Sequence, residues 1–313
     1  MSDNRRIEPY TKPPQTFTQQ AEIQILKRGL EEISIDGLAK EFSRINYYRF
    51  TGYLYHRRKK NSNEGAYKKG TSYLYFKKIY DFDEELRLLL LQKIGQFEIS
   101  LKTQLVNFVT LKENDQFFYK NPSILEGLSK DENKWKKYQE KLEKQIRNAQ
   151  TFSIELANFF KKYTQEPGLP AWAVCEILTF GQISQIFCGL KINIQNDFVA
   201  KLYPEINKEI FRSWLTTISS LRNMCAHHNQ IIGRSLENWK HKRPDGQNPI
   251  QQFFSQYKRL TTYTSFAILE YFLKPFNSDK QFKNEHKNLL EKHQIKPIFL
   301  GMHKNWEEDI IWN

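Results

Sequence analysis

The stretch that decides the fold is DEELRLLLLQKIGQFEISLKTQLVNFVT, residues 83–110. Its apolar residues follow one another at steps of four, four, three, four, four and three: Leu86, Leu90, Ile94, Phe97, Leu101, Leu105 and Phe108. Such steps keep the side chains on one stripe of an α-helix, so we predict a long helix over 83–110 that buries this stripe. The acids Asp81, Asp83 and Glu84 are expected at its N-terminal end, where the helix dipole favours negative charge.

Helical patterns continue on both sides of this stretch. Shorter helices are expected at 16–30, 34–42, 153–163 and 171–190, and one longer helix at 250–273. Residues 46–55 are rich in aromatic side chains, and their spacing alone fits a strand as well as a helix. Residues 111–150 are polar and charged, which indicates a surface helix or an insertion. The sequence thus predicts an all-α protein, with a small N-terminal region over about 1–75 and a helical domain over 76–313.

The charge balance points to an anionic partner. The 313 residues include 48 Lys and Arg against 35 Asp and Glu, so the formal net charge is +13. Such an excess attracts polyanions through steering and counterion release. Nucleic acid is therefore favoured as the partner, and the alternative is a basic surface that is only solvated.

The composition also argues against several classes of protein. Three cysteines, at 175, 188 and 225, are too widely spaced for a disulfide framework or a zinc site, which fits a reducing cytosol. No apolar signal core opens the sequence, and no run approaches the roughly 18 apolar residues of a membrane span. We expect a soluble cytoplasmic protein with no metal, no cofactor and no membrane contact.

A second stretch carries chemistry: RNMCAHH, residues 222–228, at the end of the apolar helical run 214–221. It combines a permanent cation, an amide and two imidazoles, which suits work on a phosphodiester. Asn223 and His227 are four residues apart and share a helix face. Arg222 and His227 are five apart, which is about 140° around the helix axis. They converge on one ligand only if the helix bends or ends there, or if a second copy of the chain contributes.

These residues are similar to a known motif. Arg222-Asn223 with His227 resembles the R-N-x-x-x-H form of the HEPN ribonuclease motif. Residues 221–229 resemble the matching block of the bacterial abortive-infection proteins of the Abi-D/Abi-F (Abi-2) family. Further blocks of that family are resembled in order by residues 46–53 (NYYRFTGY), 80–98 (from YDFD to Glu98), 169–181 (from LPAW to TFG) and 301–312 (from GMHKNW to Trp312). The resemblance therefore spans nearly the whole chain.

The resemblance implies an all-helical HEPN bundle in an antiviral, toxin-like protein. HEPN enzymes typically cut RNA without metal, as dimers that pair two Arg-His motifs across a twofold cleft. Carried over to this chain, Arg222 and His227 are the catalytic pair, Asn223 assists, and Glu98 orients the arginine from the facing helix. Some members of this group are thought to bind a small structured noncoding RNA that restrains them. The implied partners are thus RNA and a second copy of the chain.

The chemistry of the motif follows from its groups. RNA carries its own nucleophile, the 2′-hydroxyl, so a base that removes its proton and a cation that stabilises the pentacoordinate phosphate are enough. His227 is the candidate base or acid, and Arg222 offers a planar fork to two phosphate oxygens. The expected products carry a 2′,3′-cyclic phosphate and a 5′-hydroxyl. DNA, which lacks the 2′-hydroxyl, is expected to resist cleavage.

A basic and aromatic segment is the candidate RNA contact. Its residues are Tyr47, Tyr48, Arg49, Tyr53, His56, Arg57, Arg58, Lys59 and Lys60. Basic side chains there can hold the RNA backbone while rings stack on bases, and the alternative is a solvated loop. Lys102 and His228 are further candidate RNA contacts. Lys102 also lies four residues after Glu98 on the long helix, so these two can pair with each other.

Other residues are expected to have structural roles. Cys225 is predicted to be a small packing residue, because no base is placed to ionise it. Trp172 is predicted to belong to the core. The remaining histidines have no partner at ligand spacing and are expected at the surface: His56, His241, His286, His293 and His303.

The function favoured by the sequence is a metal-independent endoribonuclease used in phage defence and restrained by a small noncoding RNA. One alternative is an RNA-binding protein that forms a ribonucleoprotein without cutting RNA. Another is a dimeric scaffold that is toxic by sequestration. Replacement of Arg222 and His227 by alanine separates the first function from the other two.

Overall fold

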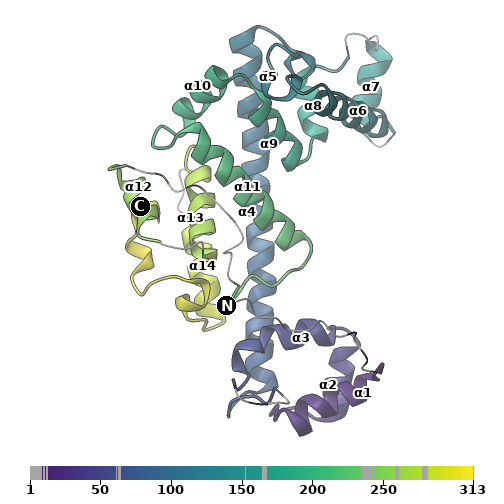
Figure 1. The fold of residues 1–313 in the computed structure, drawn as a ribbon, viewed down its shortest axis with the longest axis vertical. Helices are drawn as coiled ribbons and strands as arrows, with labels where there is room; N and C mark the ends of the chain where they lie inside the picture. Colours follow the sequence, from purple (N-terminus) through teal and green to yellow (C-terminus); the bar gives the residue numbers. More distant parts are fainter. Residues whose placement is uncertain are drawn as a thin grey trace. The chain divides into compact units, whose positions relative to one another are not determined.

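The computed structural model describes residues 9, 11, 13–60, 62, 65–151, 153–163, 168–234, 242, 244, 246–257, 261–276 and 281–312. This part of the chain forms fourteen α-helices and no β-strand (Figure 1). Its only β-type pairings are two isolated bridges, Glu31 with Ser72 and Arg58 with Tyr67. The all-α prediction is confirmed.

The chain divides into two compact units, Met1–Asp83 and Glu84–Asn313. The division falls inside one long helix, α4 (Tyr73–Glu113). The sequence placed the boundary between residues 75 and 76, where this helix has just begun. The helix continues without interruption through that point.

The first unit is built from short helices before α4. They are α1 (Phe17–Glu22), a π-helical turn (Ile23–Lys27), α2 (Ile35–Phe42), α3 (Tyr47–Tyr53) and a 3-10 turn (Tyr55–Arg57). The ambiguous segment 46–55 is thus helical. Its helix starts where Asn46 accepts a hydrogen bond from the backbone N–H of Tyr48 at 2.7 Å, which is a standard way to cap a helix.

Aromatic rings form the core of the first unit. Phe50 lies 4.2 Å from Phe76, centroid to centroid, and 5.2 Å from Phe42. Tyr53 packs edge-on against Phe76, and its hydroxyl donates to the buried carboxylate of Asp83 at 2.6 Å. These contacts join α2 and α3 to the beginning of α4.

The acids near the start of α4 do not cap it. The helix begins at Tyr73, so Asp81, Asp83 and Glu84 lie inside it, and the prediction that they stand at its N-terminal end is wrong. The sequence between residues 73 and 82 is rich in aromatic and basic residues, and the apolar stripe chosen for the prediction starts later. Asp83 is buried and accepts the hydrogen bond from Tyr53.

The second unit contains the rest of α4 and ten further helices. They are α5 (Glu126–Ser129), α6 (Glu132–Ala149), α7 (Ile154–Lys162), α8 (Ala171–Ile177), α9 (Phe180–Gly189), α10 (Ile192–Leu202), α11 (Lys208–Ala226), α12 (Pro249–Ser255), α13 (Thr262–Leu273) and α14 (Gln281–Lys292). Short 3-10 turns occur at Phe118–Lys120, Pro297–Leu300, Trp306–Glu308 and Ile310–Trp312.

The core of the second unit forms around the predicted stripe of α4. Six of its seven residues are buried, and only Phe108 is half-buried. Phe97 stacks on Phe272 of α13 at 4.7 Å and lies 5.9 Å from Phe180 of α9. Trp214 of α11 adds an edge-on contact to Phe272 at 5.9 Å. The stripe therefore brings α9, α11 and α13 around α4.

Two predictions about the C-terminal third are wrong. The single helix expected at 250–273 is two helices, α12 and α13, and α13 starts at a capping box in which Thr261 and Thr264 bond each other's backbone N–H groups. His286, expected at the surface, is fully buried among rings such as Phe266 at 5.1 Å. His241 lies outside the described residues.

Candidate functional site

Helix α11 positions the Arg-His motif. Asn207 caps it by accepting from the N–H of Ile210 at 2.9 Å, and Glu209 stands in the first turn, where the dipole favours an acid. Its buried residues recur at helical spacing: Phe211, Trp214, Leu215, Ile218, Leu221 and Cys225. This face packs on α9, α10 and α13. Arg222 and Asn223 follow the last turns of that stripe on the exposed side.

The helix ends in a Schellman motif at the two histidines. The N–H of His228 donates to the carbonyl of Cys225 at 3.1 Å, and the N–H of Asn229 donates to the carbonyl of Met224 at 2.9 Å. His227 is the C-cap residue of the helix, with a φ of −92°. His228, which follows it, is left-handed, with a φ of 56°. Arg222 and His227 were expected to converge on one ligand only if the helix bends or ends there, or if a second copy contributes. The helix does end at the motif.

The polar side chains of the motif face solvent. Those of residues 222, 223 and 227–229 are all exposed. Among the described residues, the side chains of Arg222 and His227 form no hydrogen bond or ion pair. After the motif the chain is anchored by Ile231 and Ile232, which are buried. The site thus presents a guanidinium and an imidazole that have no polar partner among the described residues, at the end of a well-packed helix.

Glu98 and Lys102 pair with each other on α4. Lys102 Nζ lies 2.9 Å from Glu98 Oε1, and the two side chains are 13% and 18% exposed. The prediction that they pair is confirmed. Within the described part of the chain Glu98 forms no ion pair with Arg222, so the single chain does not bring these two predicted site residues together. Lys102 is likewise engaged rather than open to a phosphate.

The cysteines are free thiols, and two of them are buried. Burial raises the pKa of Cys175 to about 11, helped by the nearby carboxylate of Glu176 and opposed by Lys102. A thiol with so high a pKa is a poor nucleophile at neutral pH. Cys225 is buried in the packed face of α11, which agrees with its predicted packing role. Trp172, predicted to be core, is instead 56% exposed at the first turn of α8.

The two arginines of the basic segment are held against tyrosine rings in the first unit. The guanidinium of Arg57 lies 5.1 Å from the centre of the Tyr75 ring, and its Nε donates to Thr71 Oγ1 at 3.0 Å. The guanidinium of Arg58 lies 5.4 Å from the centre of the Tyr55 ring. Such cation–π contacts fix the direction of a side chain without neutralising its charge.

His56 contributes a hydrogen bond to this segment rather than a charge. Its Nε2 lies 2.7 Å from the hydroxyl oxygen of Tyr75. Partial burial lowers the pKa of His56, and the positive charges of Arg57 and Lys68 lower it further. The imidazole is therefore mostly neutral at neutral pH.

The other predicted RNA contacts differ in exposure. Tyr48, Lys59 and Lys60 are exposed, whereas Tyr47 and Arg49 are half-buried. Tyr53 is 1% exposed and belongs to the aromatic core. The structure corrects the prediction for Tyr53, because a buried ring cannot stack on a base.

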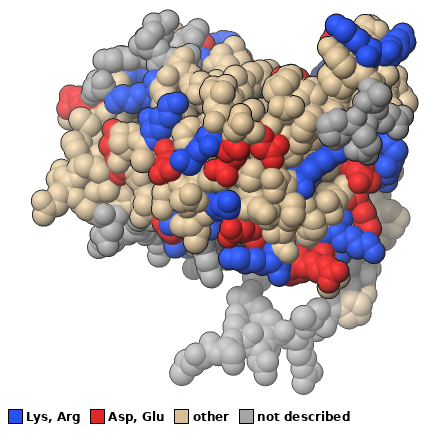
Figure 2. Space-filling model, turned by 90° about the horizontal axis from the view of Figure 1, so that it is seen from above, with Lys and Arg blue, Asp and Glu red and all other residues tan. Residues whose placement is uncertain are grey.

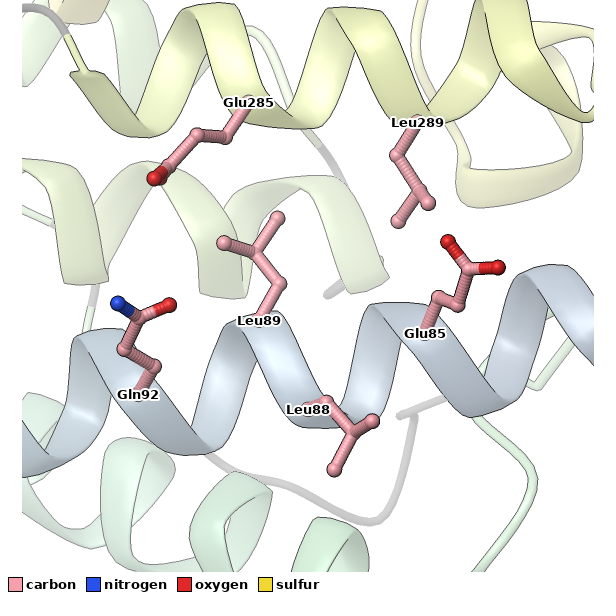
Figure 3. A pocket seen from close by; sticks show the side chains of 6 residues that line it. All are labelled: Glu85, Leu88, Leu89, Gln92, Glu285 and Leu289. Carbon is pink, nitrogen blue, oxygen red and sulfur yellow. The ribbon is translucent and has the colours of Figure 1, made fainter.

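A pocket of about 360 Å³ lies between α4 and α14 in the second unit. It is lined by Glu85, Leu88, Leu89, Gln92, Glu285 and Leu289 (Figure 3). Both of its carboxylates already have cationic partners. Lys292 meets Glu85 at 2.7 Å, and the buried Lys93 meets Glu285 at 2.5 Å. The pocket includes none of the motif residues.

On the face drawn in Figure 2, the positive charges do not form one continuous patch. Figure 2 shows one face on which lysine and arginine are interspersed with aspartate and glutamate. The net charge of +13 therefore does not by itself locate a nucleic-acid surface. Local groups such as those of the motif are the features that can mark where a nucleic acid would bind.

Two features are absent from the described part of the chain. No group of three or more His, Cys, Asp or Glu side chains is arranged to hold a metal ion there. None of the helices in the same part of the chain combines the length and the apolar character needed to cross a bilayer.

Comparison with known families decides the family of this chain. The model of the family described as Abi-like protein matches residues 41–233, which include α4, α11 and the whole motif. The chain belongs to the Abi-like protein family. The family connects the chain with abortive infection, a form of phage defence. The match ends before residues 301–312, so the resemblance of that block remains a prediction. No curated protein and no solved structure matches the chain.

Proposed function

We propose that this Abi-like protein is a metal-independent endoribonuclease of the HEPN type that acts in phage defence. The observation that carries the proposal is the state of the motif: Arg222 and His227 are exposed at the end of α11, and among the described residues neither has a polar partner. A guanidinium and an imidazole exposed at the same helix end can both reach a phosphate from outside the chain. Membership of the family supplies the biological setting.

The proposed reaction uses these two groups on RNA. His227 removes the proton of the 2′-hydroxyl, whose oxygen attacks the adjacent phosphorus. Arg222 donates to two phosphate oxygens and stabilises the charge that develops on them. The 5′-oxygen leaves with a proton, so the products carry a 2′,3′-cyclic phosphate and a 5′-hydroxyl.

A second copy of the chain is proposed as a partner, and one face of α4 supports this. Leu88 and Ile99 are 63% and 67% exposed, although both are large and apolar. Gly95 lies between them on the same stripe, and a β-carbon there would meet no atom within 4 Å. An open glycine between exposed apolar residues lets another helix approach closely. Sedimentation of Gly95→Leu against the wild type tests this, because a dimer through this face must weaken.

A small structured RNA is proposed as the restraining partner. The exposed Tyr48 and the Tyr55–Arg58 stack offer rings and charges of the kind that hold unpaired bases and phosphates. Sequencing of the nucleic acid that copurifies with the protein tests this part. One defined small RNA supports restraint by a partner, whereas random fragments contradict it.

The test of the enzymatic proposal is the double variant Arg222→Ala/His227→Ala. We expect it to lose RNA cleavage and toxicity while RNA binding is kept, because binding also uses other basic surfaces. Arg212→Ala is the matched control, since Arg212 is exposed on the same helix and lies about 15 Å from Arg222 along the axis. Cleavage by the wild type must persist in a chelator and must spare DNA. If the double variant is still toxic, the proposal that toxicity comes from RNA cleavage is rejected.

The alternative function is RNA binding without cleavage. It is favoured by the first unit, in which Tyr55 is 71% exposed and stacked by Arg58. In that case the variants Tyr55→Ala and Arg58→Ala abolish toxicity, whereas the double variant at the motif does not.

A further inference from the structure

The backbone at His228 adopts a conformation that few non-glycine residues adopt. Its φ of 56° is left-handed, and among the described non-glycine residues only Glu32, Asn114 and Gln294 share a positive φ. The left-handed region brings the β-carbon close to the following carbonyl oxygen. Glycine avoids this cost, and it is the residue that most often fills this position at the end of a helix. The turn alone would therefore be better served by glycine.

A strained position that keeps a large side chain suggests that the side chain has a use. The ring of His228 is exposed, and it directly follows His227 in the chain. The two backbone hydrogen bonds that close α11, at 3.1 and 2.9 Å, hold both histidines at the same helix end. Two imidazoles thus stand at the helix end that also carries Arg222.

The reaction proposed above requires two proton-transfer groups. One removes the proton of the 2′-hydroxyl, and another supplies a proton to the leaving 5′-oxygen. Arg222 cannot supply it, because a guanidinium does not lose its proton in proteins. The amides of Asn223 and Asn229 do not titrate, and Cys225 is buried. Within residues 222–229, the one remaining exposed group that can hold and release a proton is His228.

We propose that His228 is the general acid of this site and that His227 is its general base. This inference rests on the proposed ribonuclease function. The 2′-oxygen bonds to phosphorus as its proton passes to His227, and the bond from phosphorus to the 5′-oxygen breaks as the proton of the His228 imidazolium passes to that oxygen. One proton is taken up and one is released, so the step balances. Each chain then carries its own acid and base.

The test uses a substrate that needs no acid. In an RNA whose scissile 5′-oxygen is replaced by sulfur, the leaving thiolate departs without being protonated. His228→Gly removes the imidazole and relaxes the backbone, and His228→Asn keeps a residue that tolerates the left-handed region. With ordinary RNA we expect both variants to lose roughly 10²- to 10⁴-fold in kcat/KM, the usual range for general acid–base catalysis. With the sulfur substrate both variants should cleave at the wild-type rate.

Controls separate this inference from the proposed function. His227→Ala should be slow on both substrates, because the base is still required when the leaving group is sulfur. Amide hydrogen exchange at residues 228 and 229 reports whether α11 still ends as in the wild type. Wild-type rates of His228→Gly on ordinary RNA overturn the assignment, and so do equal losses on both substrates. A wild type that cleaves neither substrate overturns the ribonuclease itself.

Discussion

The end of α11 and the basic segment of the first unit both carry arginine and histidine. In the basic segment these side chains have partners within the chain, whereas at the end of α11 Arg222 and His227 have none among the described residues. In the basic segment, Arg57 is bonded to Thr71 and lies over a tyrosine ring, and His56 is bonded to a tyrosine hydroxyl. At the end of α11, Arg222 and His227 have no such partners among the described residues. The side chains of the basic segment therefore contribute to the packing of the first unit, whereas Arg222 and His227 stay accessible to a ligand.

This difference separates two roles for basic residues. A guanidinium that is already oriented by a ring and a hydroxyl presents a fixed charge, which suits the holding of an RNA backbone. An open guanidinium beside an imidazole can bind tightly to a phosphate whose charge is changing, which suits catalysis. Substitutions that preserve charge but alter shape can tell the two roles apart.

The largest effect is expected from Arg222→Lys compared with Arg57→Lys. Both changes keep the positive charge and remove the planar fork. At Arg222 the loss of two aligned donors should lower kcat for RNA cleavage by about 10²- to 10³-fold. At Arg57 kcat should stay at the wild-type value, because the site of reaction is untouched. Single-turnover cleavage measures both. Equal losses would abolish the distinction between the two regions.

The same contrast explains what the sequence could and could not predict. The periodic stripe of α4 and the stripe of α11 are strong signals, and both helices form with those residues buried. The pairing of Glu98 with Lys102 also followed from spacing, because neighbours four apart on a helix meet. The start of α4 did not follow, because aromatic residues at 73–80 pack within the first unit.

The burial of polar and aromatic side chains was harder to predict from the sequence than the helices were. Tyr53 and His286 carry polar groups and stand in polar segments, yet both are enclosed by rings from distant parts of the chain. Trp172 is apolar and yet exposed, since it lies in the first turn of a short helix whose packed face is formed by Ala171, Val174 and Cys175. The left-handed φ of His228 had no signal, because glycine or asparagine is the usual mark of such a residue. In each case the tertiary neighbours decide, and local spacing along the chain does not reveal which residues they are.

The next effect separates two tyrosines of the same segment. Tyr53→Phe removes one donor from the buried carboxylate of Asp83 and should lower the free energy of unfolding by about 2 to 3 kcal/mol. Tyr48 is 84% exposed, so Tyr48→Ala should leave stability unchanged and weaken RNA binding by about 1 to 3 kcal/mol if it stacks on a base. Denaturant unfolding and binding titrations measure the two quantities. A change of RNA affinity in folded Tyr53→Phe would place this ring at the RNA after all.

A buried histidine provides an effect that depends on pH. Complete burial lowers the pKa of His286 to about 3, below its ordinary 6.5, so between these values the unfolded chain binds a proton that the folded chain refuses. The contribution of His286 to stability is therefore constant above pH 6.5 and is lost as the pH falls, by about 2 kcal/mol at pH 5. His286→Leu should remove this share of the acid sensitivity. If the wild type and the variant unfold with the same pH dependence between 5 and 8, the imidazole is not buried as a neutral group.

The smallest effect is expected at Glu98. It decides whether Glu98 has a structural role in its pair with Lys102 or a role in the site with Arg222. Glu98→Gln keeps the shape but removes the charge that faces Lys102 in a largely buried pair. If the pair is structural, unfolding becomes easier by about 1 kcal/mol and the cleavage rate per folded molecule is unchanged. If Glu98 of one copy orients Arg222 of another, cleavage falls far more than stability does. Glu98→Gln/Lys102→Met supplies the control, because removing both charges restores the stability of a structural pair and cannot restore an orienting contact.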